Sequence, residues 1–212
     1  MRAAIEKVDT AAYNIATRCV VGDALTRSAR TFPDRTALLL AGRAVTYLEL
    51  EQRANGLASW LATHLPSQQP VAMLMRNSDA FVITYFASAK AGMVALPVNL
   101  EQTAEEIAYV LGDASAKVIV TDAEFVHLLL TIVPSLPAIE HILVVDDDCP
   151  ATVHGVQTTK WADVAIRATE GPPVMINDRD IVQCLYTSGT TSRPKGVLTA
   201  HVSVVVANLT MA

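Results

Sequence analysis

The residues best able to do chemistry stand together in one run, Tyr186-Thr-Ser-Gly-Thr-Thr-Ser-Arg-Pro-Lys-Gly-Val197. Gly189 is surrounded by residues with hydroxyl side chains, and a lysine follows Pro194. The hydroxyl residues are Thr187, Ser188, Thr190 and Thr191, and the lysine is Lys195. Small side chains let backbone N–H groups approach an anion, hydroxyls add hydrogen-bond donors, and the lysine adds positive charge. The run therefore predicts a loop that binds a polyphosphate, with an ordinary polar hairpin loop as the alternative interpretation.

A loop of the Walker A type matches this run less well. That loop has Gly directly before the lysine and Ser or Thr directly after it, on a turn from strand to helix. Here Pro194 precedes Lys195, Gly196 follows it, and Val197–Thr199 has the composition of a returning strand. A P-loop ATPase is therefore the weaker hypothesis, and a helix beginning at Lys195 would support it.

Other polar residues are expected to be structural or solvent-exposed. No metal-ligand spacing relates the histidines His64, His127, His141 and His154. The run Asp146–Asp148 is expected to form a solvated turn rather than a cation site. Cys184 falls within a predicted buried strand and has no base partner near it in the sequence, which disfavours a nucleophilic role.

Composition narrows the class of protein. The chain has 212 residues, with 16 Lys and Arg against 21 Asp and Glu, and a net charge of −5. Only 17% of the residues are charged and 51% are apolar, which excludes intrinsic disorder. The lack of a basic cluster argues against nucleic-acid binding. Three widely spaced cysteines, with no signal peptide and no apolar stretch long enough to cross a bilayer, predict a cytoplasmic protein.

Helical patterns alternate with short apolar runs, as in an α/β fold. Capping residues predict helices that begin at Thr46, at Asn77 or Ser78, and at Thr103, and that end near Pro66, Gly92 and Gly112. Strands are expected over 71–75, 93–96, 118–121, 142–145 and 181–186, with a further helix over 123–133. Residues 146–180 are expected to form a long surface connection with local structure around 164–166. The continuously apolar strands indicate a largely parallel sheet with helices on both faces.

The Tyr186–Val197 run resembles the signature loop of the adenylate-forming superfamily, whose pattern is Tyr-Thr-Ser-Gly-Thr-Thr-Gly-x-Pro-Lys-Gly-Val. Further segments are similar to other blocks of that superfamily: Phe32–Arg35, Thr46–Leu50, Lys90–Gly92, Pro97–Asn99, Thr103–Tyr109, Lys117–Asp122 and His201. The resemblance covers about residues 23 to 206. It implies an α/β fold that is the N-terminal lobe of such a ligase, incomplete. The implied divisions are a partial AMP-binding domain over 1–212, an N-terminal extension over 1–22, and a strand–loop–strand over 181–201.

The resemblance also implies an activity, that of an ATP-dependent acyl-CoA ligase. Pro97-Val98-Asn99 is closer to acyl-CoA ligases than to peptide-synthetase domains. In such enzymes a carboxylate, here expected to be a fatty acid, attacks the α-phosphate of Mg·ATP, and the thiol of CoA then displaces AMP. By resemblance, Thr187–Thr191 and Lys195 hold the ATP phosphates, with Lys195 as an electrostatic clamp, and His201 lies near the substrate pocket. No certain catalytic residue, Mg²⁺ ligand or CoA site can be placed in this chain.

Two departures and one absence qualify this expectation. Ser192 stands where the superfamily has Gly, and Glu101 stands where such ligases often carry Arg. The later motifs of the superfamily are absent, so the chain is expected to be an N-terminal fragment that is inactive alone. The alternative is a non-catalytic nucleotide-binding fragment that pairs with a separately encoded C-terminal half; a homo-oligomer and a peripheral association with membranes also stay open. The low charge predicts an exposed apolar patch near the C-terminal strands.

Overall fold

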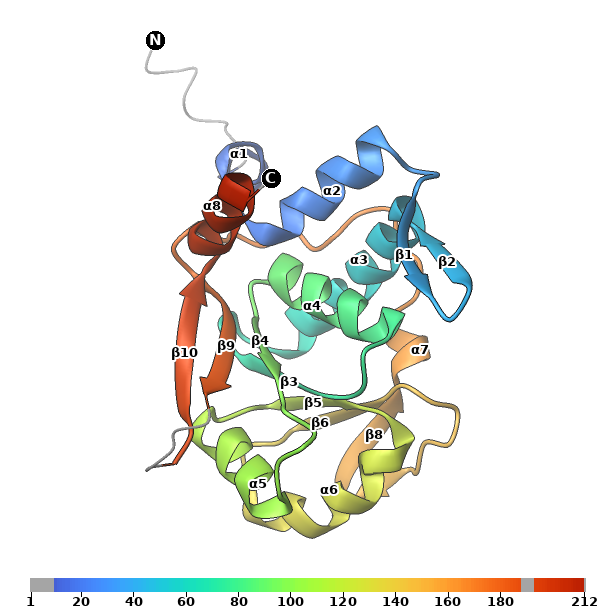
Figure 1. The fold of residues 1–212 in the computed structure, drawn as a ribbon, viewed down its shortest axis with the longest axis vertical. Helices are drawn as coiled ribbons and strands as arrows, with labels where there is room; N and C mark the ends of the chain where they lie inside the picture. Colours follow the sequence, from blue (N-terminus) through green and yellow to red (C-terminus); the bar gives the residue numbers. More distant parts are fainter. Residues whose placement is uncertain (1–9, 188–192, 212) are drawn as a thin grey trace.

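The computed structural model describes residues 10–187 and 193–211 (Figure 1). Its helices are α1 (Thr10–Thr17), α2 (Val21–Thr31), α3 (Tyr47–His64), α4 (Asp79–Ala91), α5 (Ala104–Asp113), α6 (Val126–Ile132), α7 (Trp161–Val164) and α8 (His201–Met211), with 3₁₀ turns η2 (Ala123–Phe125) and η3 (Val133–Ser135). Its strands are β1 (Thr36–Leu40), β2 (Arg43–Thr46), β3 (Pro70–Leu74), β4 (Val94–Pro97), β5 (Val118–Thr121), β6 (His141–Val144), β7 (Thr152–Val153), β8 (Val156–Lys160), β9 (Ile181–Thr187) and β10 (Lys195–Ala200). The expected α/β class is confirmed.

One large sheet organises these elements. Its strand order is β10-β9-β4-β3-β5-β6-β8-β7, and the strands from β9 to β8 run parallel to their neighbours. The outermost strands β10 and β7 are antiparallel to β9 and β8. A separate antiparallel hairpin joins β1 and β2. The predicted largely parallel sheet is therefore present.

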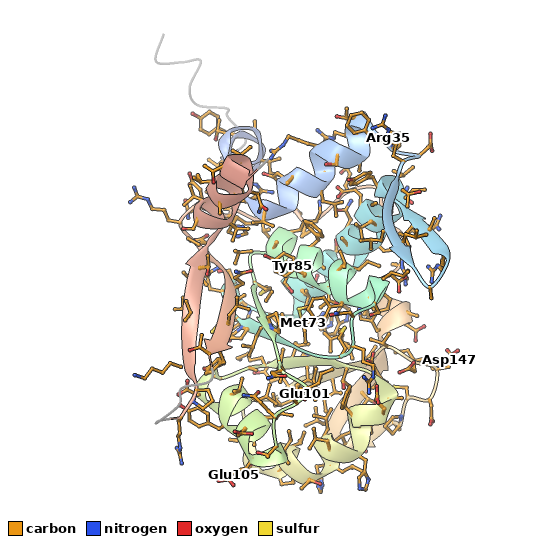
Figure 2. All side chains as sticks on the ribbon, in the orientation of Figure 1. Arg35, Met73, Tyr85, Glu101, Glu105 and Asp147 are labelled. Atoms are coloured by element: carbon orange, nitrogen blue, oxygen red, sulfur yellow. The ribbon has the colours of Figure 1, made fainter. Side chains whose placement is uncertain are left out.

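Helices cover both faces of the sheet, as the continuous apolar strands predicted. Successive residues of β3 point to opposite faces, so Val71 belongs to the core beneath α3 and α4, whereas Ala72 and Leu74 belong to the core beneath α5 and α6. Figure 1 shows these two helix pairs on opposite sides of the strands, and Figure 2 shows Met73 in the interior between them. A sheet buried on both faces has no solvent side, which is why its strands lack polar alternation.

The predicted caps are formed. The side chains of Thr46, Ser78 and Thr103 each accept a hydrogen bond from a backbone N–H in the first turn of their helix. Gly92 ends α4 in the left-handed conformation, with φ 70°. Helix α5 ends near Gly112 as predicted, but it continues through Asp113 and its C-cap is Ala114 rather than a glycine.

The connection over 146–180 also differs from the expectation. It contains β7, β8 and α7, and β8 pairs with β6 as a full member of the sheet. The sequence of β8, Val-Gln-Thr-Thr-Lys, is polar because this strand lies near the sheet edge and is only partly buried. The predicted helix over 123–133 is divided into η2, α6 and η3. Within the described residues, no helix combines the length and the apolar character that crossing a membrane requires.

Candidate functional site

The predicted phosphate loop joins β9 to β10, and the structure describes the two residues that flank its centre. Thr187 is the last residue of β9 and Lys195 the first of β10, and the antiparallel register pairs them directly. Side chains of directly paired residues lie on the same face of a sheet, close enough to share one ligand. Both residues are exposed. The other predicted phosphate ligands, Ser188, Gly189, Thr190 and Thr191, lie outside the described residues.

The Thr187–Lys195 pair lies at the edge of the sheet where ligands bind in other open α/β sheets. Because β9 is parallel to β4, Thr187 lies at the edge of the sheet where the parallel strands have their carboxyl ends. In open α/β sheets, ligands bind in crevices beyond that edge. Two hollows open along it. One of about 630 Å³ is lined by 75–77, Phe81 and 97–100, and one of about 580 Å³ is lined by Arg76, Ser78, 122–124, Val145 and Asp146.

Two basic residues near this edge of the sheet, Arg76 and Lys195, differ in whether they form an ion pair. Arg76 forms an ion pair with Glu124, and its backbone N–H donates to Asp122 at 2.7 Å. Burial raises the pKa of the Asp122 carboxyl, an effect that this hydrogen bond opposes. Lys195 forms no salt bridge with any residue in the described parts of the chain. Among the described residues, the Arg76 charge is therefore neutralised by Glu124, whereas the Lys195 charge has no acidic partner.

The ends of the hairpin are held by contacts that sequence reasoning missed. The hydroxyl of Tyr186 donates to the Asp113 carboxylate at 2.6 Å, and the Arg193 guanidinium lies 5.1 Å from the centre of the Tyr109 ring. Burial, together with Asp113, raises the pKa of the Tyr186 phenol well above its usual range, so the phenol keeps its proton. Tyr109 and Asp113 are four residues apart and thus share one face of α5. That spacing was the signal in the sequence, but nothing local identified their partners.

Gly196 is required for this arrangement. It pairs with Tyr186 in the register, and a Cβ atom at Gly196 would lie 3.2 Å from the Tyr186 ring and 2.9 Å from the sulfur of Cys184. Both distances are shorter than real Cβ contacts allow without displacement of the neighbour. The glycine after the lysine therefore lets the tyrosine ring lie across β10. Burial raises the pKa of the Cys184 thiol, which agrees with a structural rather than a nucleophilic role.

His201 lies at the other end of β10 from Lys195. The intervening strand spans 195–200, which is about 20 Å at about 3.3 Å per residue. The imidazole is fully buried, and its Nδ1 accepts from the backbone N–H of Val21 at 3.2 Å. Its Nε2 has no hydrogen-bond partner among the described residues. Burial lowers the pKa of His201 to about 4, so the ring is neutral at physiological pH. Within this lobe it stabilises the contact of α8 with α2.

Of the two departures from the superfamily pattern, only Glu101 can be placed. It is exposed in the connection after β4 (Figure 2), where its N–H donates to the side chain of Asn99 at 3.0 Å. Ser192 lies outside the described residues. Among the residues that the structure does describe, no group of three or more histidine, cysteine, aspartate or glutamate side chains could hold a metal ion.

The strand that follows the loop decides between the two loop classes considered above. Lys195 begins strand β10, and the first helix after it, α8, starts at His201. A Walker A lysine stands instead in the turn that leads from a strand directly into a helix. The arrangement needed for a P-loop ATPase is therefore not formed here.

A family model described as AMP-binding enzyme matches residues 25–212. A 3-hydroxybenzoate/4-hydroxybenzoate–CoA ligase of Thauera aromatica is 32% identical over 82% of this chain, which covers 33% of that protein. The long-chain-fatty-acid–CoA ligase FadD13 of Mycobacterium tuberculosis is 34% identical over 76% of this chain, which covers 30% of it. The chain thus spans about a third of the length of these curated relatives.

Solved structures share the fold. The N-terminal domain of FACL13 from Mycobacterium tuberculosis superposes with a TM-score of 0.74 at 27% identity, over 86% of this chain and 44% of that one. The anthranilate CoA ligase AuaEII in complex with anthranoyl-AMP gives a TM-score of 0.77 at 28% identity, over 86% of this chain and 35% of that one.

Proposed function

The chain belongs to the AMP-binding enzyme family, and from this membership we propose that it is the phosphate-binding lobe of an ATP-dependent acyl-CoA ligase. Its own part is to hold the β- and γ-phosphates of ATP while a carboxylate attacks the α-phosphate. The single observation that carries the proposal is the pairing of Thr187 with Lys195 at the carboxyl edge of the sheet. A hydroxyl and an ammonium group without a salt-bridge partner among the described residues lie on the same face there, at the two ends of a run rich in small and hydroxyl residues.

The geometry supports a defined electrostatic role. When the bond between the α- and β-phosphates breaks, negative charge grows on the departing pyrophosphate, and donors fixed nearby stabilise that transition state. Lys195 supplies positive charge and Thr187 supplies a hydroxyl donor, so neither residue needs to exchange a proton with the substrate. Mg²⁺ would neutralise further phosphate charge when bound, and we assign no residue of this chain to it. The same holds for the thiol-transfer step, to which no described residue can be assigned.

The substrate class follows from the relatives. The proteins similar to this chain include ligases for hydroxybenzoates and for long-chain fatty acids, and a ligase crystallised with an acyl-adenylate. All three activate a carboxylic acid, and within that class we propose a fatty acid. A compartment that supplies ATP and CoA and keeps thiols reduced, the cytoplasm, agrees with the free cysteines Cys19, Cys149 and Cys184.

The test is pyrophosphate binding by the 212-residue chain, measured by isothermal titration calorimetry. Substitution Lys195→Met removes the charge and leaves an exposed side chain of similar length, so the affinity should fall about ten-fold, as for loss of a hydrogen bond to a charged group. Lys160→Met, an exposed lysine on β8, is the matched control and should bind as the wild type does. Equal affinity of the Lys195 and Lys160 variants would contradict the proposal.

A second function is favoured by the exposed apolar residues of β9, β10 and α8. These are Leu185, Val197, Leu198, Val206 and Leu209. Such a surface suits a fragment that binds nucleotide and pairs with a separate protein carrying the rest of the ligase. Pyrophosphate binding without ATP–pyrophosphate exchange in the presence of fatty acids, followed by exchange when that protein is added, supports this second function. Robust exchange by the chain alone excludes it.

A further inference from the structure

Two side chains of α5 contact the ends of the hairpin that carries Lys195. Two residues before the lysine, the Arg193 guanidinium lies over the ring of Tyr109 at 5.1 Å. Pro194 stands between them, and its fixed φ limits how far Lys195 can move relative to Arg193. One residue after the lysine, Gly196 lies under the ring of Tyr186, whose hydroxyl is bonded to Asp113. Tyr109 therefore holds the Arg193 side chain before the lysine, and Asp113 holds the Tyr186 ring that lies against Gly196 after it.

We propose that Tyr109 and Asp113 are positioning residues that set the place of Lys195 for phosphate binding, through Arg193 and Tyr186. The inference rests on the proposed function, because it concerns the same phosphate site. Neither residue touches the ligand in this scheme. The scheme concerns only residues that the structure describes, on α5 and at the ends of β9 and β10.

The packing around these contacts supports a positioning role. Tyr109 and Tyr186 are both half-buried against the core beneath α5, so their rings have few alternative orientations. A hollow of about 570 Å³ beside this contact is lined by residues of α5, by Ser135 and Leu136, and by Arg193 and Pro194. Because this space is open, the side chain of Arg193 can move away from α5 when the ring of Tyr109 is removed. The loop end is held by two side-chain contacts rather than by continuous packing.

A substitution of Tyr109 can distinguish a loss of positioning from a direct loss of positive charge near the ligand. Substitution of Arg193 itself would remove a positive charge near the proposed phosphate site, so a loss of affinity could come from either cause. Tyr109→Leu leaves every charge in place and keeps apolar contacts with the core, but it removes the aromatic face that attracts the guanidinium. Tyr109→Phe keeps that face and is expected to restore the contact. Phe32→Leu is the matched control, since it removes the same type of contact from Arg35, which lies 4.7 Å from the Phe32 ring at the other end of the molecule.

Two measurements on the 212-residue chain test the inference. The side-chain Nε–Hε resonance of Arg193 in a ¹⁵N–¹H spectrum reports stacking on the ring without any ligand, and calorimetric titration with pyrophosphate reports affinity. Tyr109→Leu should move the Arg193 resonance and weaken pyrophosphate binding about three-fold, the size expected for loss of an exposed cation–π contact. Tyr109→Phe and Phe32→Leu should match the wild type in both measurements. Tyr186→Phe, which removes only the hydroxyl bonded to Asp113, should also weaken binding.

The outcomes separate this inference from the proposed function. No pyrophosphate binding by the wild-type chain overturns the proposed function, and the positioning role with it. Binding by the wild type that is weakened by Lys195→Met but unchanged by Tyr109→Leu and Tyr186→Phe leaves the function standing and overturns the positioning role. Equal weakening by Tyr109→Phe and Tyr109→Leu also overturns it, because the aromatic face would then be irrelevant. If Tyr109→Leu fails to fold, the comparison of Tyr186→Phe with the wild type decides the matter.

Discussion

Lys195 and His201 lie at opposite ends of one strand, and their surroundings give them opposite properties. Lys195 is exposed at the carboxyl edge of the sheet and has no salt-bridge partner in the described parts of the chain. His201 is fully buried beside α2 and is neutral because burial disfavours its protonated form. The resemblance implied a place near the substrate pocket for His201. In this lobe its described contact is the hydrogen bond from the Val21 N–H.

The buried imidazole makes stability depend on pH. The pKa of His201 is lowered from 6.5 to about 4, so below about pH 6.5 the unfolded chain binds a proton that the folded chain does not. The free energy of unfolding should therefore fall as the pH drops from about 7 to about 5, by about 2 kcal/mol. Urea unfolding at these two pH values measures it.

The matched variants identify the group responsible for this pH dependence. Asparagine at position 201 keeps an acceptor for the Val21 N–H but does not titrate. The free energy of unfolding of His201→Asn should therefore not show the fall that the buried imidazole causes between about pH 7 and about pH 5. His154→Asn, at an exposed histidine, should keep it. The charged groups that face His201 are Asp178, Asp180, Asp23 and Arg18, and their own titration is common to all three proteins. An unchanged pH dependence in His201→Asn would exclude the buried imidazole as its source.

At the scale of elements, α5 shows how a local signal supports a distant site. Its capping box is complete: the Glu106 N–H donates to the Thr103 hydroxyl, and the Thr103 N–H donates to the Glu106 carboxylate at 2.8 Å. The hydrogen bonds that the Thr103 N–H and hydroxyl donate to the Glu106 carboxylate lower the pKa of Glu106. The helix that begins with this cap carries Tyr109 and Asp113, which contact Arg193 and Tyr186 at the ends of the predicted phosphate loop.

Loss of this cap should destabilise the fold. Thr103→Ala removes the side-chain acceptor and should lower the free energy of unfolding by about 1 kcal/mol, measured by urea denaturation. Thr131→Ala makes the same chemical change at an exposed position inside α6, where alanine is the better helix former, and should be neutral or slightly stabilising. A cost at position 131 equal to that at 103 would show that the cap contributes nothing specific.

At the scale of the whole molecule, the low charge predicts an exposed apolar patch near the C-terminal strands, and large exposed apolar side chains do lie on these elements. Leu198 of β10 is 63% exposed and Leu209 of α8 is 73% exposed, and Leu185, Val197 and Val206 add to the same elements. Figure 1 shows α8 and the β9–β10 hairpin together along one side of the molecule. A monomeric protein rarely exposes so many large apolar side chains on neighbouring elements.

This surface should drive association of the 212-residue chain. Sedimentation velocity over a range of concentrations should show self-association of the wild type, and the double variant Leu198→Glu/Leu209→Glu should shift the population toward monomer. Leu39→Glu is the control, because Leu39 is 71% exposed on β1, which belongs to the separate hairpin. A wild-type chain that stays monomeric, or a control variant with the same effect as the double variant, would contradict the prediction.

Local patterns in the sequence determined much of this fold. The caps at Thr46, Ser78 and Thr103 and the left-handed Gly92 depend on a few neighbouring residues, so they can be predicted without knowing what packs around them. The buried strands β3, β5 and β6 are recognisable because burial on both faces demands continuous apolar runs. Strand β8 was missed for the converse reason. A partly exposed strand near the edge keeps polar residues, and only its pairing with β6 identifies it.

Part of the candidate site could likewise be predicted from local sequence, and part depended on the tertiary structure. The residue types from 187 to 195 alone indicate a polyphosphate ligand, since small residues, hydroxyls and a lysine suit an anion whatever surrounds them. Only the tertiary structure decided that Thr187 pairs with Lys195 at the carboxyl edge of the sheet. It also placed His201 in a buried position at the other end of β10, about 20 Å away at about 3.3 Å per residue. The contacts of Tyr109 and Asp113 with the ends of the hairpin likewise come from the tertiary structure alone. Tyr186 is 73 residues from Asp113 in the chain. Contacts at such separations follow from the order of strands in the sheet, which local residue preferences do not encode.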